Sequence, residues 1–120
     1  MSNIKIKRIY EPSSPTDGYR ILVDRLWPRG MKKEDAHVDK WLKEIAPSTE
    51  LRQWFHTEPG RWVQFKAKYL DELKKSNTVD ELRVLINEHP TVTLLYSVKD
   101  EEHNHALILK DFILKKYLQT

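Results

Sequence analysis

The spacing of apolar residues predicts three β-strands in this chain. Residues 4–9, IKIKRI, alternate isoleucine with lysine, which is typical of a half-exposed strand near a sheet edge. Residues 19–23, YRILV, and 91–98, TVTLLYSV, are nearly continuous apolar runs, as expected for strands covered on both faces. Residues 11–18 contain two prolines, two serines and a glycine, so we expect a plain connecting loop there or, as the alternative, a lid over a pocket.

Helical patterns dominate residues 33–89, where prolines and a glycine divide the chain into segments. One apolar stripe at spacings of three and four predicts a single helix face formed by Trp62, Phe65, Tyr69 and Leu73. Other helical signals are an apolar face of Trp41, Leu42 and Ile45 before Pro47, a Ser48 cap before Leu51, Trp54 and Phe55, Pro59 in a first turn, and a capping box of Thr78 and Glu81. A final amphipathic helix is expected over residues 103–118.

This order of elements predicts a single α/β domain over residues 1–120. A strand, a long helical crossover and a second apolar strand favour parallel pairing with a right-handed connection. The expected fold is a small, mainly parallel sheet of about three strands with a long helical crossover and a C-terminal helix.

The two most polar segments of the chain directly follow the two buried strands. They are DRLWPRG (residues 24–30) and KDEEHNH (residues 99–105). Ligands of open α/β sheets bind beyond the carboxyl ends of the strands, and adjacent parallel strands place those ends on the same side. We therefore expect six side chains to come together: Asp24, Arg25, Arg29, Tyr96, His103 and His105.

Composition narrows the function classes. The 120 residues include no cysteine, which excludes thiolate nucleophiles, disulfides and cysteine-bound metals, and no cofactor is indicated. The net charge is +3 and Lys and Arg are spread along the chain, so nucleic acid stays open as a partner but is not favoured. No segment is apolar enough for a signal peptide or a membrane span, and we expect a soluble cytoplasmic protein. The sequence does not define the oligomeric state.

The DRLWPRG segment is a candidate anion site. Arg25 and Arg29 stand four residues apart around the stiff Trp27-Pro28 pair, and two guanidinium groups can hold one phosphate or carboxylate from two sides. In the structural alternative, Asp24 pairs with Arg25, Trp27 packs in the core and Pro28 shapes a turn. Arg25, Arg29 and Trp27 are thus the candidate ligand-binding residues here.

The KDEEHNH segment supplies the candidate proton-transfer groups. Asp100 is suited to cap a helix, and Glu101 and Glu102 complement the positive end of its dipole. His103 and His105 are two residues apart, so on a helix they project to nearly opposite sides, and no metal site is predicted. One of them near a helix start can act as an acid or base, with a hydrogen-bonded structural histidine as the alternative.

Tyr96 and Ser97 end the last strand, and we expect one of them, with Tyr96 as the candidate, to point toward the pocket. Neither belongs to a recognisable nucleophile arrangement. Glycine-rich phosphate loops, His-Glu-x-x-His and dinucleotide fingerprints do not occur in the sequence.

Four blocks, in order along nearly the whole chain, resemble the domain of unknown function 488 family in its short YeaO-like branch. The blocks are DGYRILVDRLWPRG (residues 17–30), APSTELRQWF (46–55), PGRWVQFKAKY (59–69) and TLLYSVKDEEHNHALIL (93–109). The activity of that family is not established, so the resemblance implies which positions matter rather than what they do.

Broader members of the family carry an Asp-Val-Arg-x-x-Pro-x-Ser-Arg element after a strand. Four residues here are similar to it: Asp24, Arg25, Pro28 and Arg29. They also carry Cys-His-Arg at the start of the last helix, and His105 is similar to that histidine. Asn104 stands where the cysteine would be and Ala106 where the arginine would be, so the resemblance does not support a cysteine-dependent mechanism here.

Two interpretations follow from these residues. In the first, an enzyme acts on a small phosphorylated or nucleotide-like ligand, with an arginine clamp, Asp24 orienting or accepting a proton, and His105 or His103 as acid and base. In the second, a non-catalytic module binds an anionic metabolite or nucleic acid through the same patch. Catalysis needs a titrating group within reach of the ligand, whereas binding needs only the arginines.

Overall fold

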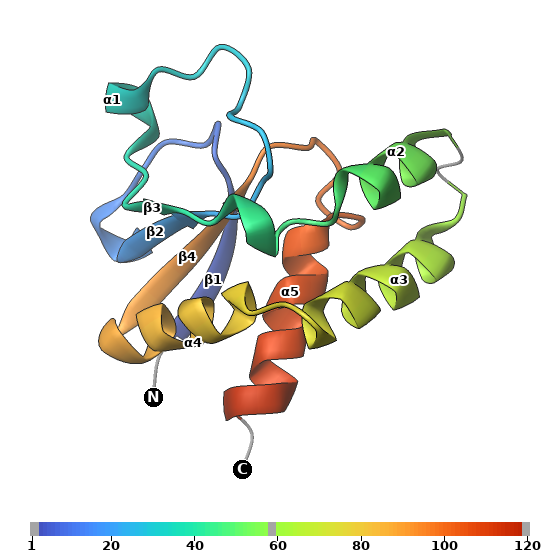
Figure 1. Ribbon diagram of the computed structural model, residues 1–120. Coiled ribbons are helices and arrows are strands. Elements are labelled where there is room, and N and C mark those ends of the chain that lie inside the picture. Colours follow the sequence, from blue (N-terminus) through green and yellow to red (C-terminus); the bar gives the residue numbers. More distant parts are fainter. Residues whose placement is uncertain (1–2, 58–59, 119–120) are drawn as a thin grey trace.

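Four parallel strands form one sheet in the computed structural model, which describes residues 3–57 and 60–118 (Figure 1). The strand order is β1 (Asn3–Arg8), β4 (Thr91–Tyr96), β2 (Tyr19–Leu22) and β3 (Lys40–Trp41). All three pairings are parallel, so the carboxyl ends of the strands share one edge of the sheet. The predicted α/β fold and the edge position of β1 are confirmed, and the sheet has four strands rather than about three.

The additional strand, β3, lies where the sequence predicts a helix face. Trp41 pairs with Leu22 of β2, and its indole Nε1 donates to the backbone oxygen of Asp24 at 2.7 Å. Only a short 3₁₀ turn, η2 (Lys43–Ile45), follows. The apolar spacing was misleading because the proline at position 47 leaves too few residues for an α-helix.

Different helices cover the two faces of the sheet. They are α1 (Lys33–Ala36), α2 (Thr49–Thr57), α3 (Trp62–Lys74), α4 (Thr78–Glu88) and α5 (His105–Ile113), which continues into the π turn η3 (Leu114–Leu118). The main core lies between one sheet face and α3, α4 and α5, while a smaller cluster under α1 and its flanking loops covers the other face (Figure 1). The predicted stripe on α3 is buried at Phe65, Tyr69 and Leu73, with Trp62 packed against its rim.

Of three predicted helix caps, one is present in the structure. Ser48 caps α2, because its Oγ accepts from the backbone N–H of Leu51. The predicted capping box of Thr78 and Glu81 does not occur at α4, because Asn77 is the N-cap and makes no side-chain cap bond. Asp100 does not cap α5 either, because Asn104 does so through its Oδ1. Pro59, predicted in a first turn, lies outside the described residues.

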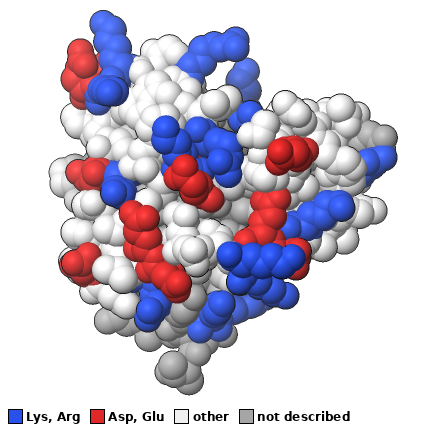
Figure 2. All heavy atoms as spheres, in the orientation of Figure 1, with Lys and Arg blue, Asp and Glu red and all other residues white. Residues whose placement is uncertain are grey.

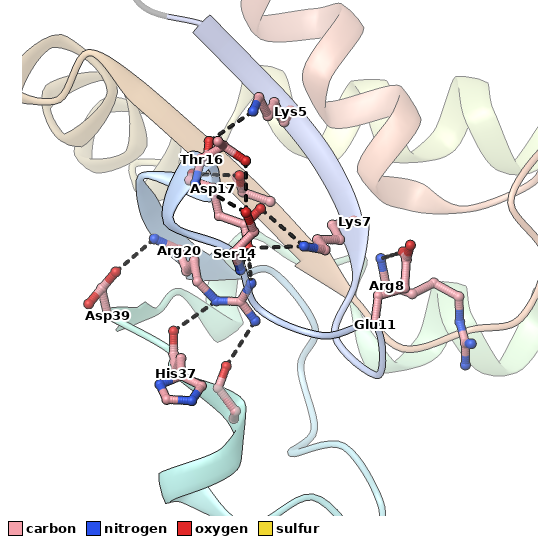
Figure 3. A network of polar contacts seen from close by, with 12 residues as sticks. Lys5, Lys7, Arg8, Glu11, Ser14, Thr16, Asp17, Arg20, His37 and Asp39 are labelled. Carbon is pink, nitrogen blue, oxygen red and sulfur yellow. Dashed lines mark hydrogen bonds and ion pairs between the residues drawn. The ribbon is translucent and has the colours of Figure 1, made fainter.

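The segment of residues 11–18 is anchored to the sheet rather than placed over a pocket. Its short 3₁₀ turn, η1 (Pro15–Asp17), brings the Asp17 carboxylate against Lys7, Arg20 and the backbone N–H of Ser14 (Figure 3). Asp17 is 4% exposed, and its backbone oxygen accepts from the Thr93 hydroxyl. The structure therefore agrees with the connecting-loop interpretation and not with the lid.

Charges of both signs are interspersed on the molecular face seen in Figure 2, where acidic side chains lie beside most of the basic ones. This matches the even spread of Lys and Arg along the sequence. Within the described part of the chain, no helix has the length and apolar character needed to cross a membrane.

Candidate functional site

A pocket of about 480 Å³ opens at the carboxyl edge of the sheet, where the sequence predicts ligand binding. Its walls come from the loops after β1, β2 and β4, from the residues before α2, and from the facing sides of α2 and α3. Of the predicted site residues, the structure brings six to this pocket: Asp24, Arg25, Trp27, Arg29, His103 and His105. Tyr96 does not line it, because the side chain packs into the main core and is 4% exposed.

Asp24 and His105 meet at the base of the pocket, although Asp24 lies just after β2 and His105 opens α5. His105 Nε2 lies 2.8 Å from the backbone oxygen of Val23 and 3.3 Å from Asp24 Oδ1. A carbonyl oxygen only accepts hydrogen bonds, so this geometry assigns a proton to Nε2 and leaves Nδ1 as the basic nitrogen of the neutral ring. The two residues that follow β2 thus fix both the position and the tautomer of His105.

The surroundings of His105 favour its neutral form. Burial lowers the pKa of the imidazole most strongly, and the charge of Arg52 lowers it further. Asp24 and the Val23 carbonyl raise it, but the net direction is below the ordinary value for histidine. The surroundings of His105 therefore favour a neutral ring over a charged one.

Asp24 has one carboxylate oxygen without a hydrogen-bond partner. The residue is 8% exposed, and Oδ2 is buried without a donor from the described residues. Such an oxygen is costly, by about 1–3 kcal/mol for a neutral group and more for a charged one. Among the described residues, no three His, Cys, Asp or Glu side chains are placed to hold a metal ion.

Arg25 holds the wall of the pocket together. Its Nε donates to the backbone oxygen of Pro47 and its Nη2 to that of Ala46, both at 3.1 Å. These two bonds use two of the five N–H groups of the guanidinium. The predicted pairing of Asp24 with Arg25 does not occur, because Asp24 lies against His105 instead.

Arg29 and Arg52 are the arginines that face the pocket without side-chain partners among the described residues. Arg29 is exposed after β2, and its backbone oxygen accepts from the Tyr10 hydroxyl at 2.8 Å. Sequence reasoning missed Arg52, although the signal is visible: Arg52, Phe55 and His56 follow the i, i+3, i+4 spacing of one helix face, and all three line the pocket.

The remaining predicted residues have structural partners. His103 is exposed, with Nδ1 3.0 Å from Asp100 Oδ2 and its ring edge-on to Trp62 at 5.2 Å between centroids. Trp27 donates from Nε1 to the Met31 backbone oxygen at 2.7 Å, in keeping with the structural alternative, while still lining the pocket.

The different partners of the two clamp arginines predict different responses to truncation. Arg25→Ala leaves two backbone oxygens without donors and should lower the free energy of unfolding by about 1–3 kcal/mol. Arg29→Ala removes an exposed side chain and should change it by less than about 0.5 kcal/mol. Urea unfolding followed by circular dichroism measures both, and equal losses in the two variants would contradict the assignment.

Comparison with known proteins places this chain in a family. Residues 3–120 match the model of the inactive DUF488-N3 subclade, DUF488-N3i. The chain belongs to this subclade. The family resemblance inferred from the sequence is thereby confirmed.

The relatives of this DUF488-N3 protein are similar over nearly their whole length. The uncharacterised protein YeaO of Escherichia coli is 50% identical over 111 residues, covering 92% of this chain and 96% of YeaO. The uncharacterised protein Rv3073c of Mycobacterium tuberculosis is 38% identical over 112 residues, covering 93% of this chain and 94% of the relative. No solved structure matches the chain.

In this DUF488-N3 chain, Asn104 occupies the position where the broader family implies a cysteine. Asn104 is 3% exposed, accepts from the Leu107 N–H and donates from Nδ2 toward the backbone oxygens of Asp100 and Glu101. Its amide therefore serves as a helix cap that holds the turn before α5 and positions His105. It does not supply a nucleophile.

Proposed function

We propose that this protein binds a small anionic organic ligand in the pocket without transforming it. The observation that carries the proposal is that Arg29 and Arg52, whose side chains have no partner among the described residues, face an aromatic wall. That wall includes Phe55 and Trp62. Guanidinium groups recognise phosphate and carboxylate, and apolar walls hold the flat part of a ligand. The pocket volume is in the range of small-molecule sites.

Two observations favour binding over catalysis. The subclade that matches the chain is described as inactive. In addition, Asn104 is fully engaged as a helix cap, and His105 directs its proton at the Val23 carbonyl rather than at the pocket. A proton held by a backbone acceptor is poorly placed for transfer to a ligand.

The enzyme interpretation keeps one supporting observation, the contact between Asp24 and His105. With Nε2 protonated, Nδ1 is available as a base, and the lowered pKa of the imidazole favours its unprotonated form. This candidate requires turnover that depends on His105. His105→Asn should then preserve ligand affinity while lowering turnover by about 10²–10⁴.

Calorimetry and thermal shift with adenosine 5′-monophosphate, ribose 5-phosphate and inorganic phosphate test the proposal. We expect at least one organic phosphate to raise the melting temperature and to be recovered unchanged by chromatography. Arg52→Ala should weaken its binding about 10- to 100-fold, because a charge-assisted hydrogen bond contributes about 1.5–3 kcal/mol.

The matched control is Lys75→Ala, which also removes one positive charge but from an exposed pair with Asp71 outside the pocket. Its affinity should stay within about twofold of the native value. An equal loss in both variants would show that net charge alone attracts the ligand, and conversion of the ligand to a product would favour the enzyme.

A further inference from the structure

The Asp24 carboxylate has an acceptor that the protein itself does not use. Oδ1 contacts His105 Nε2, whereas the buried Oδ2 has no hydrogen-bond partner among the described residues. Most buried polar atoms in folded proteins have a partner, so an exception inside a pocket wall calls for an explanation. The Trp41 indole does not satisfy Oδ2, because it donates to the Asp24 backbone oxygen and not to the carboxylate.

The Asp24 carboxylate and the pocket arginines attract different chemical groups. Arg29 and Arg52 attract an anion, while a carboxylate repels one and attracts an N–H or O–H donor. The torsion about the Cβ–Cγ bond of aspartate is soft, so Oδ2 can turn toward a bound donor without displacement of the backbone. One ligand that satisfies both ends must carry an anionic group at one end and a donor at the other.

The aromatic wall adds a third requirement. Trp62 packs against Phe65 at 5.6 Å and Phe55 at 5.9 Å between ring centroids, and all three rings line the pocket. Such a wall suits a flat ring carried by the same ligand.

We infer that the ligand is a ring-bearing organic phosphate that donates a hydrogen bond to Asp24, of the nucleoside monophosphate class. The inference rests on the proposed function and makes it specific. In this assignment Asp24 is a specificity residue: it selects ligands with a donor and discriminates against otherwise equal anions. The donor is either a base N–H or a sugar hydroxyl, and the experiment separates these sources.

The experiment uses calorimetry on the full chain with the four ribonucleoside 5′-monophosphates and two matched sets of analogues. One set is 2′,3′-dideoxy and lacks the sugar hydroxyls, and the other has its base N–H groups methylated. For the nucleotide that binds most tightly, we expect one of the two deletions to weaken binding about 10- to 100-fold. The deletion that does so identifies the donor.

Asp24→Leu distinguishes a lost hydrogen bond from a steric effect of the methyl groups, because leucine has a similar shape and no acceptor. In this variant, the nucleotide and its analogue should bind within about twofold of each other. Asp71→Ala, which removes an exposed carboxylate outside this pocket, should keep the native ratio. If Asp24→Leu does not fold, the analogue series on the native protein still decides the matter.

The outcomes separate the two proposals. If no nucleotide and no simple phosphate binds, the proposed function fails and this inference fails with it. If nucleotides bind and both deletions leave the affinity within twofold, only the inference fails. A loss that persists unchanged in Asp24→Leu would likewise overturn the role of Asp24.

Discussion

Replacing Asp17 with alanine should lower the free energy of unfolding by about 3–5 kcal/mol, as expected when one member of a buried ion pair is removed. The Asp17 carboxylate contacts Arg20 Nη1 and lies 3.1 Å from Lys7 Nζ, and the side chains of Asp17 and Arg20 are each 5% exposed. Without the carboxylate, the Arg20 charge stays buried and the Ser14 N–H loses its acceptor. Denaturant unfolding monitored by circular dichroism measures the loss.

The same carboxylate gives the native protein a defined acid sensitivity. Burial raises the pKa of Asp17, but hydrogen bonds from Ser14, Lys7 and Arg20 and the charge of Lys7 together lower it below its ordinary value. The unfolded carboxyl therefore takes up its proton first as the pH falls. The stabilisation is fully present above the unfolded pKa, about 4, and is lost as the pH falls from there through the folded pKa. Asp17→Ala should flatten this part of the stability curve.

An exposed aspartate provides the control for Asp17. Asp71 pairs with Lys75 at 3.1 Å on the surface of α3, where its side chain is 64% exposed. Asp71→Ala should cost no more than about 0.5 kcal/mol, as exposed helix pairs do. A loss at Asp17 no larger than at Asp71 would contradict the view that residues 11–18 are anchored through this ion pair (Figure 3).

The sequence predicts which strands and loops form the site, because the pattern of apolar residues that marks a strand is local in the sequence. Runs of apolar residues locate β2 and β4, and the parallel topology then requires the segments after them to meet, as Asp24 and His105 do. The two-residue strand β3 escapes prediction because its pairing with β2 is a tertiary contact and leaves no period in the sequence.

The roles of individual polar side chains are harder to predict because their partners are distant in sequence. Arg25 resembles an anion ligand, yet it donates to carbonyl groups 21 and 22 residues away. Asp17 resembles an ordinary turn residue, yet folding buries it between Lys7 and Arg20. Composition identifies the residue types that a site can use, and only packing decides which of them remain available to a ligand.

Replacing Gly18 with alanine should lower the free energy of unfolding by about 3–5 kcal/mol, from backbone strain together with steric overlap. Gly18 has φ +66°, and an added Cβ would lie 2.3 Å from the backbone oxygen of Thr91. This close approach lets the chain enter β2 directly beside the start of β4, where Tyr19 pairs with Val92. The clash involves backbone on both sides, so no side-chain rotation relieves it.

The other two glycines separate strain from overlap. Gly30 has φ +77° but nothing within 4 Å of an added Cβ, so Gly30→Ala should cost only the strain, about 1 kcal/mol. Gly60 has neither feature, and Gly60→Ala should change stability by less than about 0.5 kcal/mol. Thermal unfolding of the three variants should rank Gly18→Ala lowest by a wide margin. Similar losses at positions 18 and 30 would show that the entry into β2 adjusts to a side chain, and that the contact between Gly18 and Thr91 does not hold the two central strands in register.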